Sequence, residues 1–318
     1  MSLTIEQIRE NTTRARDLMR RSRQEGFAVG AFNIDNQETL QAISQAAQKL
    51  QAPVMVEVSA GEVKTMGGCQ NIRDMVNNYR TLYGIEMYIN LDHAPTVELC
   101  QQAIGAGFEF IHIDISQANH DAAVDEIIEK TRQVVEYAKT TGALVEAEER
   151  YFFGDSNVHK ETIDYEEVKK WNTKPLEARD FVAATGIDTM AVQVGNLHGL
   201  YPVPKILDLD LLGEIRGAID CQISLHGGSG TPLHYFEDAA KIGVSKININ
   251  SDLRYAFRTT LEKVLRENPD EYAVYKLMPQ VCAAVAAVVE EKIQAFGSAG
   301  KAVEVRRSEE RRVGKECR

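Results

Sequence analysis

Tyr88-Ile89-Asn90-Leu91-Asp92-His93-Ala94 is an apolar strand pattern that ends in an acid and a histidine side by side. Pro95 follows and stops the strand, so Asp92 and His93 stand at its carboxyl end. Successive strand residues point to opposite faces, so both side chains can enter one site only where the chain has begun to turn. Taken alone, the pair is best explained as a helix cap and a polar rim residue, since lone histidines are rarely ligands. The other strands change that interpretation.

Seven further strand patterns alternate with helical patterns along the chain. The strands are predicted at residues 27–32, 53–58, 110–114, 143–148, 189–194, 221–225 and 245–249. Helices are predicted at residues 4–25, 37–50, 71–83, 97–107, 122–140, 176–185, 209–218 and 232–242, and helical patterns continue to about Phe296. Eight strand–helix units of roughly 30 residues predict an α/β fold, a (β/α)8 TIM barrel with an N-terminal helix and a C-terminal helical extension. A doubly wound sheet is the alternative, but no Gly-rich dinucleotide fingerprint follows Phe32.

Length and composition fit one such barrel. The chain has 318 residues, of which 44% are hydrophobic and 26% charged, and we expect residues 1–306 to form a single domain. A net charge of −11 argues against non-specific nucleic-acid binding. No apolar run approaches the roughly 20 residues of a membrane span, and the N-terminus has no signal-peptide core. We therefore expect neither nucleic-acid nor membrane partners.

The cysteines and the last dozen residues carry separate information. Five cysteines without a Cys-x-x-Cys spacing favour a reduced, cytoplasmic setting; they are Cys69, Cys100, Cys221, Cys282 and Cys317. Residues 307–318 break from the preceding pattern and look like the translation of a sequencing adapter. We therefore interpret them as a non-native tail and exclude them from fold reasoning.

A polar residue stands at the end of every predicted strand. The set comprises Asn33, Ser59, Asp92 with His93, Asp114, Glu148, His198, His226 and Asn248. In a parallel barrel these ends converge on the face where catalytic sites of the fold lie. Turn preferences explain some Asn, Asp and Ser, but not three histidines. Three neutral imidazoles with an open fourth position indicate a catalytic zinc site, beside which Asp92 could move a proton.

The remaining histidines are weaker evidence for a functional site, whereas two Gly-rich turns are stronger evidence. His112 lies within a strand and is interpreted as a core or interlayer residue. Gly-rich turns follow strands six and seven at residues 195–199 and 226–230, and Asn250-Ser251-Asp252 follows strand eight. Backbone amides at such helix N-termini form an anion pocket, and barrels often hold phosphate after strands seven and eight. The pattern predicts phosphate binding.

Together these motifs resemble the class II, zinc-dependent ketose-bisphosphate aldolases. The resemblance runs from about Gly26 to Arg258. Its matching stretches are Ala31-Phe32-Asn33, Leu91-Asp92-His93, Ile113-Asp114, Val145-Glu146-Ala147-Glu148, His198-Gly199, Leu225-His226-Gly227-Gly228-Ser229-Gly230 and Asn248-Ile249-Asn250-Ser251-Asp252-Leu253-Arg254.

The resemblance implies a role for each matched residue. Zinc would bind His93, His198 and His226, with Asp92 as the proton-transfer residue. Glu148 and Asp114 would support the metal or an alternative ion position. The residues implied in substrate and phosphate binding are Asn33, Ser59, Gly199, Gly227, Ser229, Asn248, Asn250, Ser251 and Arg254. A neighbouring subunit could supply Arg254. A monovalent cation (Na+ or K+) often assists at the phosphate site.

The implied activity is zinc-dependent, reversible cleavage of a phosphorylated ketose. Fructose 1,6-bisphosphate is the default substrate, giving dihydroxyacetone phosphate and an aldehyde such as glyceraldehyde 3-phosphate in glycolysis or related carbohydrate metabolism. Tagatose bisphosphate, a deoxyketose phosphate and a sulfo-sugar phosphate are alternatives. A non-catalytic phosphosugar-binding subunit is the alternative from another class. The resemblance also implies a homo-oligomer, a dimer or tetramer.

Three departures from the family pattern bear on the substrate. Residues 149–155 replace a mobile loop that usually carries a catalytic acid, for which Asp155 and Glu161 are candidates. Pro202 stands where a phosphate-binding lysine is usual, and Lys205 is a candidate replacement. Ile115 occupies a position that is usually glycine. The polar segment at 149–172 is long for an unstructured connection in a compact domain, which predicts a functional loop or lid.

Overall fold

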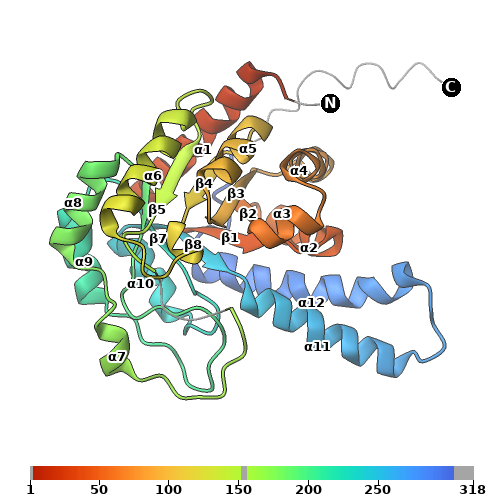
Figure 1. Cartoon of the computed structure of the whole chain (residues 1–318). Coiled ribbons are helices and arrows are strands. Elements are labelled where there is room, and N and C mark those ends of the chain that lie inside the picture. Colours follow the sequence, from red (N-terminus) through yellow and green to blue (C-terminus); the bar gives the residue numbers. More distant parts are fainter. Residues whose placement is uncertain (1–2, 152–155, 304–318) are drawn as a thin grey trace.

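Eight parallel strands close into one barrel in the computed structural model, which describes residues 3–151 and 156–303 (Figure 1). Each strand pairs with the next in chain order, and β8 closes the barrel against β1. The strands are β1 Val29–Asn33, β2 Val54–Val58, β3 Met87–Ala94, β4 Phe110–Ile113, β5 Leu144–Ala147, β6 Thr189–Ala191, β7 Gln222–Leu225 and β8 Val244–Ile249. The predicted (β/α)8 fold is confirmed.

Helices alternate with the strands and surround the barrel (Figure 1). They are α1 Ile5–Glu25, α2 Gln37–Leu50, α3 Ala60–Thr65, α4 Cys69–Tyr83, α5 Val97–Ala106, α6 Val124–Ala138, α7 Tyr165–Lys169, α8 Pro175–Thr185, α9 Leu209–Ala218, α10 His234–Ile242, α11 Ser251–Glu267 and α12 Val274–Ala295, with a 3-10 turn η1 at Ile115–Gln117. Thr4 and Gln7 form a capping box that begins α1, and Gly26 ends it in the left-handed conformation. The sequence thus sets this helix locally.

One end of the barrel interior is apolar. Side chains of α1 pack there against inward-facing residues of the first five strands. This apolar layer consists of Ala15, Leu18, Met19, Phe27, Val29, Ala31, Met55, Tyr88, Phe110 and Leu144. The N-terminal helix therefore closes the end of the barrel opposite to the ends of the strands where polar residues were predicted.

The next layer of the interior is polar and ionic. Two residues beyond the apolar layer on their strands lie Glu57, Asn90, His112 and Glu146, all buried. Lys246 of β8 lies among them, and its Nζ is 3.0 Å from Glu146 Oε2 and 3.7 Å from Glu57 Oε2. Because strand residues two apart share a face, the same alternation that buries apolar groups at one end delivers charged groups toward the other.

Two helices extend beyond the barrel after its last strand. α11 and α12 run side by side away from it (Figure 1), and α12 also packs on α2. Phe296, just past α12, accepts a hydrogen bond from the amide of Ala28 at 2.9 Å, which ties this extension to the start of β1. The predicted C-terminal helical extension is present.

The structure differs from the predicted elements at a few boundaries. β6 ends at Ala191 rather than at residue 194, because the amide of Gln193 bonds Thr173 Oγ1 and the amide of Val194 bonds Asn196 Oδ1 instead of a neighbouring strand. Two short helices, α3 and α7, occupy segments expected to be loops. Within residues 3–151 and 156–303, no helix has the length and apolar character needed to cross a membrane. Residues 307–318 lie outside the described part.

Candidate active site

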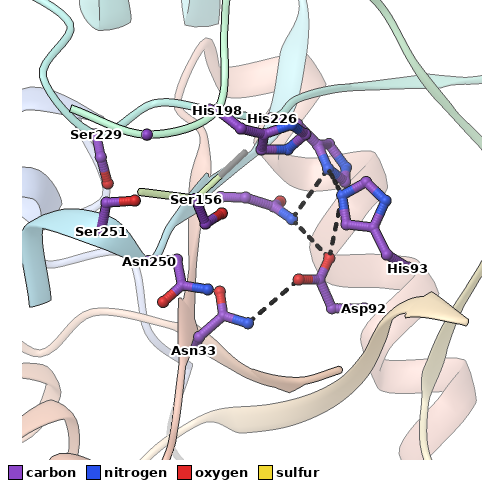
Figure 2. A pocket seen from close by; sticks show the side chains of 12 residues that line it. Asn33, Asp92, His93, Ser156, His198, His226, Ser229, Asn250 and Ser251 are labelled. Carbon is purple, nitrogen blue, oxygen red and sulfur yellow. Dashed lines mark hydrogen bonds and ion pairs between the residues drawn. The ribbon is translucent and has the colours of Figure 1, made fainter. Parts of the chain in front are cut away.

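A pocket opens at the carboxyl ends of the strands (Figure 2). Its lining consists of Asn33, Asp92, His93, Ser156, His198, Gly199, His226, Gly227, Ser229, Asn248, Asn250 and Ser251. All but Ser156 are predicted site residues, contributed by segments that span more than half of the chain. In Figure 2 the histidines and Asp92 lie on one side, with Ser229 and Ser251 on the other.

A break in β3 brings Asp92 and His93 into the same site. The pairing of β3 with β4 shifts between Leu91 and Ala94, and His93 has a φ of 44°. A bulge of this kind re-aims a side chain, so two adjacent residues face the barrel interior. A turn was predicted at this point of the chain, and the structure has it inside the strand. A left-handed histidine costs free energy that the surrounding contacts must offset.

Asp92 is fixed by two amide side chains. Asn33 Nδ2 donates to its Oδ2 and Asn248 Nδ2 to its Oδ1, each at 3.2 Å (Figure 2). Burial alone would raise the pKa of Asp92, but the charge of His93, a hydrogen bond with His112 and the charge of Lys246 outweigh it and hold the pKa well below its usual value. Asp92 is therefore an ionised carboxylate, able to accept a proton.

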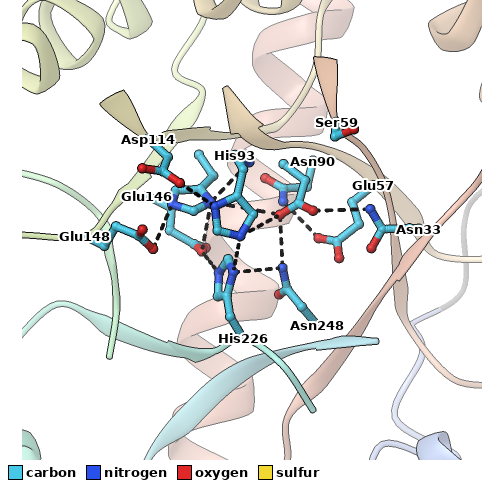
Figure 3. A network of polar contacts seen from close by, with 12 residues as sticks. Asn33, Glu57, Ser59, Asn90, His93, Asp114, Glu146, Glu148, His226 and Asn248 are labelled. Carbon is cyan, nitrogen blue, oxygen red and sulfur yellow. Dashed lines mark hydrogen bonds and ion pairs between the residues drawn. The ribbon is translucent and has the colours of Figure 1, made fainter. Parts of the chain in front are cut away.

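Two of the histidines are oriented by carboxylates behind them (Figure 3). His93 Nδ1 is 2.6 Å from Asp114 Oδ2, and His226 Nε2 is 2.6 Å from Glu146 Oε1. An ionised carboxylate only accepts, so these ring nitrogens donate. The opposite nitrogens, His93 Nε2 and His226 Nδ1, approach each other to 2.9 Å. Carboxylate-backed imidazoles whose other nitrogens converge are the arrangement that metal-binding histidines adopt.

His198 completes a cluster of imidazoles. Its ring centroid is 5.2 Å from that of His93 and 6.1 Å from that of His226. Burial lowers the pKa of His226 to about 3 and that of His198 well below its usual value. For His93 the acids Asp92, Asp114 and Glu146 outweigh burial and raise the pKa to about 9. A proton and a metal ion would therefore compete for His93.

The donor set fits a divalent metal ion. Nitrogen and oxygen atoms of Asp92, His93, His112 and His226 lie within 4.8 Å of one another, and a second such group comprises His93, His112, Asp114 and Glu148. His112 Nε2 and Glu148 Oε2 lie 3.6 Å apart, buried without a hydrogen-bond partner. Orphaned buried polar atoms are costly, and a cation near them would satisfy both. The imidazole-rich first group has the chemistry of a zinc site, but it contains His112 and not the predicted ligand His198.

Backbone groups dominate the opposite side of the pocket. Gly199, Gly227 and Ser229 belong to the turns after β6 and β7, while Asn250 and Ser251 begin α11. The amide of Asp252 donates to Ser229 Oγ at 3.0 Å, linking the turn after β7 to this helix. The N-terminus of a 17-residue helix favours anions through its dipole. This side suits a phosphate group.

Four predicted site residues do not line the pocket. Asp114 and Glu148 lie behind the histidines (Figure 3). Ser59 precedes α3 and donates its amide to Glu62. Arg254, on α11, pairs with Asp35 at 2.9 Å and with Glu62. Their predicted roles stay predictions, and Ser59 and Arg254 lie outside the cluster.

A polar network that was not predicted from the sequence lies beneath the site. His112, interpreted as a core or interlayer residue, is fully buried, but its ring centroid is only 4.4 Å from that of His93. Glu146 was named only within a matching stretch, with no role, and Lys246 was not named. The available signal was alternation, since His112 precedes Asp114 by two residues and Glu146 precedes Glu148 by two, which puts each pair on one strand face. Ser156, in the divergent loop, carried no such signal.

The candidate loop residues have separate outcomes. Asp155 lies outside the described residues. Glu161 has a 68% exposed side chain 3.0 Å from His159 Nδ1, and it does not line the pocket. Lys205 is buried beneath the pocket, in contact with backbone carbonyls rather than facing the cavity.

Comparisons with known proteins agree with this geometry. Residues 13–301 match the family model described as fructose-bisphosphate aldolase class-II. The chain is 36% identical over 281 residues to a fructose-bisphosphate aldolase of Geobacillus stearothermophilus, covering 87% of this chain and 94% of that one. It is 36% identical over 301 residues to the enzyme of that name from Streptococcus pneumoniae, covering 91% and 98%.

A solved structure shares the whole architecture. The YdjI aldolase from Escherichia coli K12 superposes with a TM-score of 0.76 and 27% identity, covering 91% of this chain and 98% of that one. The structure of a putative fructose-1,6-bisphosphate aldolase from Coccidioides immitis gives 0.75 and 27%, over 90% and 96%.

Proposed function

The chain belongs to the class-II fructose-bisphosphate aldolase family, and from this premise we propose that it cleaves a phosphorylated ketose by a reversible retro-aldol reaction. Fructose 1,6-bisphosphate is the default substrate, giving dihydroxyacetone phosphate and glyceraldehyde 3-phosphate. The observation that supports the proposal best is Asp92, an ionised carboxylate held by two amides beside converging imidazoles and opposite a phosphate-binding surface.

His93, His198 and His226 would hold a zinc ion, with Asp114 and Glu146 fixing two of the rings from behind. Zinc, when bound, would supply Lewis-acid polarisation of the ketose carbonyl. Asp114, Glu148 and His112, together with His93, form the second group of potential ligands, where an ion could take an alternative position. The carboxylates around these residues favour the binding of a cation over that of a neutral molecule.

Asp92 would carry the proton transfer. Its carboxylate accepts the proton of the C4 hydroxyl while the C3–C4 bond breaks, the C4 oxygen becomes the aldehyde and the bonding electrons move toward the C2 oxygen. In the condensation direction the same carboxyl group returns the proton. Asn33 and Asn248 hold both carboxylate oxygens, so Asp92 is positioned before the substrate binds.

The backbone side of the pocket would bind one substrate phosphate through Gly199, Gly227, Ser229, Asn250 and Ser251. We also propose that Ser59 and Arg254 serve the second phosphate. We propose that a neighbouring subunit supplies Arg254, because within its own chain this residue pairs with Asp35 and Glu62. The protein is further proposed to be a cytoplasmic homo-oligomer, which solution scattering would test.

A metal-replete cleavage assay on a panel of ketose phosphates tests the function. Fructose and tagatose 1,6-bisphosphates, a deoxyketose phosphate and a sulfo-sugar phosphate should differ in kcat/KM, and the largest value identifies the substrate. A chelator should abolish cleavage and added zinc should restore it. Full activity after chelation would contradict the metal-dependent mechanism, and no cleavage of any substrate would favour a phosphosugar-binding protein.

A further inference from the structure

A buried lysine lies directly beneath the phosphate-binding side of the pocket. Lys205 stands in the segment between β6 and α9 and is only 1% exposed. Among the residues that the structure describes, no carboxylate oxygen lies within 4 Å of its Nζ, unlike the buried Lys246 with its two glutamates. A lysine charge is buried without a carboxylate only where other groups compensate it.

Four backbone carbonyl oxygens surround this ammonium group. Lys205 Nζ donates to Leu197 O at 2.6 Å, to Gly199 O at 2.7 Å and to Gly227 O at 2.9 Å. It also contacts the carbonyl of Ser229. An ammonium has three N–H groups, so four acceptors exceed its donors and surround the charge rather than pair with it. We define these four carbonyls as the carbonyl cage.

The carbonyl cage exists because the turns after β6 and β7 touch. A Cβ on Gly227 would stand 2.1 Å from Leu197 O, so no larger residue permits this approach. Gly199 and Gly227 both have positive φ values, 86° and 63°, a conformation that glycine adopts without strain. The two turns line the pocket with one surface and point carbonyls at Lys205 with the other.

A ring of backbone carbonyls is also the ligand set that replaces the hydration shell of a monovalent cation. The carbonyl cage therefore has the chemistry of a Na+ or K+ site, but the amino group of Lys205 already fills it. The expected free monovalent cation does not fit beside this side chain. The lysine instead brings its own charge, tethered to the chain.

The charge of Lys205 connects the carbonyl cage to the phosphate site. Burial lowers the pKa of Lys205 to about 7, and the carboxylate of Asp252 opposes that effect. A phosphate bound against Gly199, Gly227 and Ser229 would add negative charge on the open side of the cage and favour the ammonium form. The lysine and the anion would thus stabilise each other.

We propose that Lys205 is a built-in substitute for the monovalent cation, locking the turns after β6 and β7 in the shape that binds the substrate phosphate. This positioning role rests on the proposed function for the identity of the ligand. It predicts that phosphate binding needs no added Na+ or K+. It also accounts for Pro202: the chain supplies the cationic charge from below rather than by a lysine reaching into the pocket from that position.

Calorimetric titration of the zinc-loaded protein with inorganic phosphate tests this without requiring turnover. For the unsubstituted protein, Kd should agree within about twofold between choline, sodium, potassium and ammonium chlorides at equal ionic strength. Lys205→Met, which fills the space without a charge, should bind about 10- to 100-fold more weakly in every salt. Lys205→Ala, which leaves space, should be equally weak in choline but should recover most of its affinity in ammonium or potassium. Lys263→Met, on an exposed helix face, is the matched control.

Phosphate binding by Lys205→Met at the affinity of the unsubstituted protein would overturn the proposal, as would an Ala variant that no cation rescues. If either variant fails to fold, the unsubstituted protein still decides, because saturable activation of its phosphate binding by potassium would show an unfilled cation site. A protein that shows the predicted salt pattern but cleaves no ketose would refute only the proposed function. A salt-sensitive aldolase would refute only the role of Lys205.

Discussion

The two ends of the barrel interior are built by the same alternation and serve opposite purposes. At the end closed by α1, Tyr88 and Phe110 pack edge to face in the apolar layer, with ring centroids 6.3 Å apart. Four residues further along the same strands, Asp92 and Asp114 stand in a site full of charge. The apolar end is stable by burial alone, whereas the polar end depends on every partner being present. The first supplies stability that the second can use for chemistry.

The largest effect is expected from Asp92→Asn at the polar end. Removing the proton acceptor should lower kcat about 10²- to 10⁴-fold. Zinc content should change little, whereas the melting temperature should fall, because an amide nitrogen replaces an oxygen that accepts from Asn33 or Asn248. Steady-state kinetics with metal analysis and a melting curve measure both. An Asn variant with undiminished kcat would mean that another group moves the proton.

Lys246→Met tests the layer between the two ends. It removes the cation that pairs with Glu146 and Glu57 in the interior, and losing one partner of a buried pair costs about 3–5 kcal/mol. Urea denaturation should show this loss in the free energy of unfolding. The control Lys139→Met removes an exposed pair with Glu136 and should cost under about 1 kcal/mol. Equal effects of the two changes would show that the buried charges are dispensable.

Leu18→Ala probes the apolar end by itself. Leu18 is 1% exposed within the apolar layer, so the cavity should cost about 2–5 kcal/mol in the free energy of unfolding. KM and kcat at a temperature well below the melting point should stay within about twofold. A large fall in kcat would show that the two ends are coupled. It would contradict the assignment of stability to the apolar end and chemistry to the polar end.

Asp114→Asn should give the smallest effect and sharpen the comparison at the metal. The change keeps the volume but weakens the charge-assisted bond to His93 Nδ1, and such outer contacts are worth about 10- to 100-fold in metal affinity. Competition with a zinc-binding dye measures this. Unchanged affinity would mean that the bulge in β3 orients His93 without help from Asp114.

Much of the fold was predictable because its signals are local. Strand and helix periods, the caps at Thr4 and Gly26, and the glycines after β7 all act within a few residues. The boundaries that failed are those where distant groups intervene, as at β6, where Thr173 takes the amide that a strand would have used. The short helix α7 lies in a polar segment without a strong hydrophobic period, so no local pattern predicted it.

The linear sequence by itself determined the barrel, its apolar and polar ends, and the set of side chains delivered to its mouth, because each depends on alternation within a single strand. Only the tertiary structure decided how they meet. The left-handed His93, the approach of His93 Nε2 to His226 Nδ1 and the carbonyl cage around Lys205 all join segments far apart in the chain. Such meetings depend on barrel closure, strand register and the contact of two turns, and no local pattern encodes them.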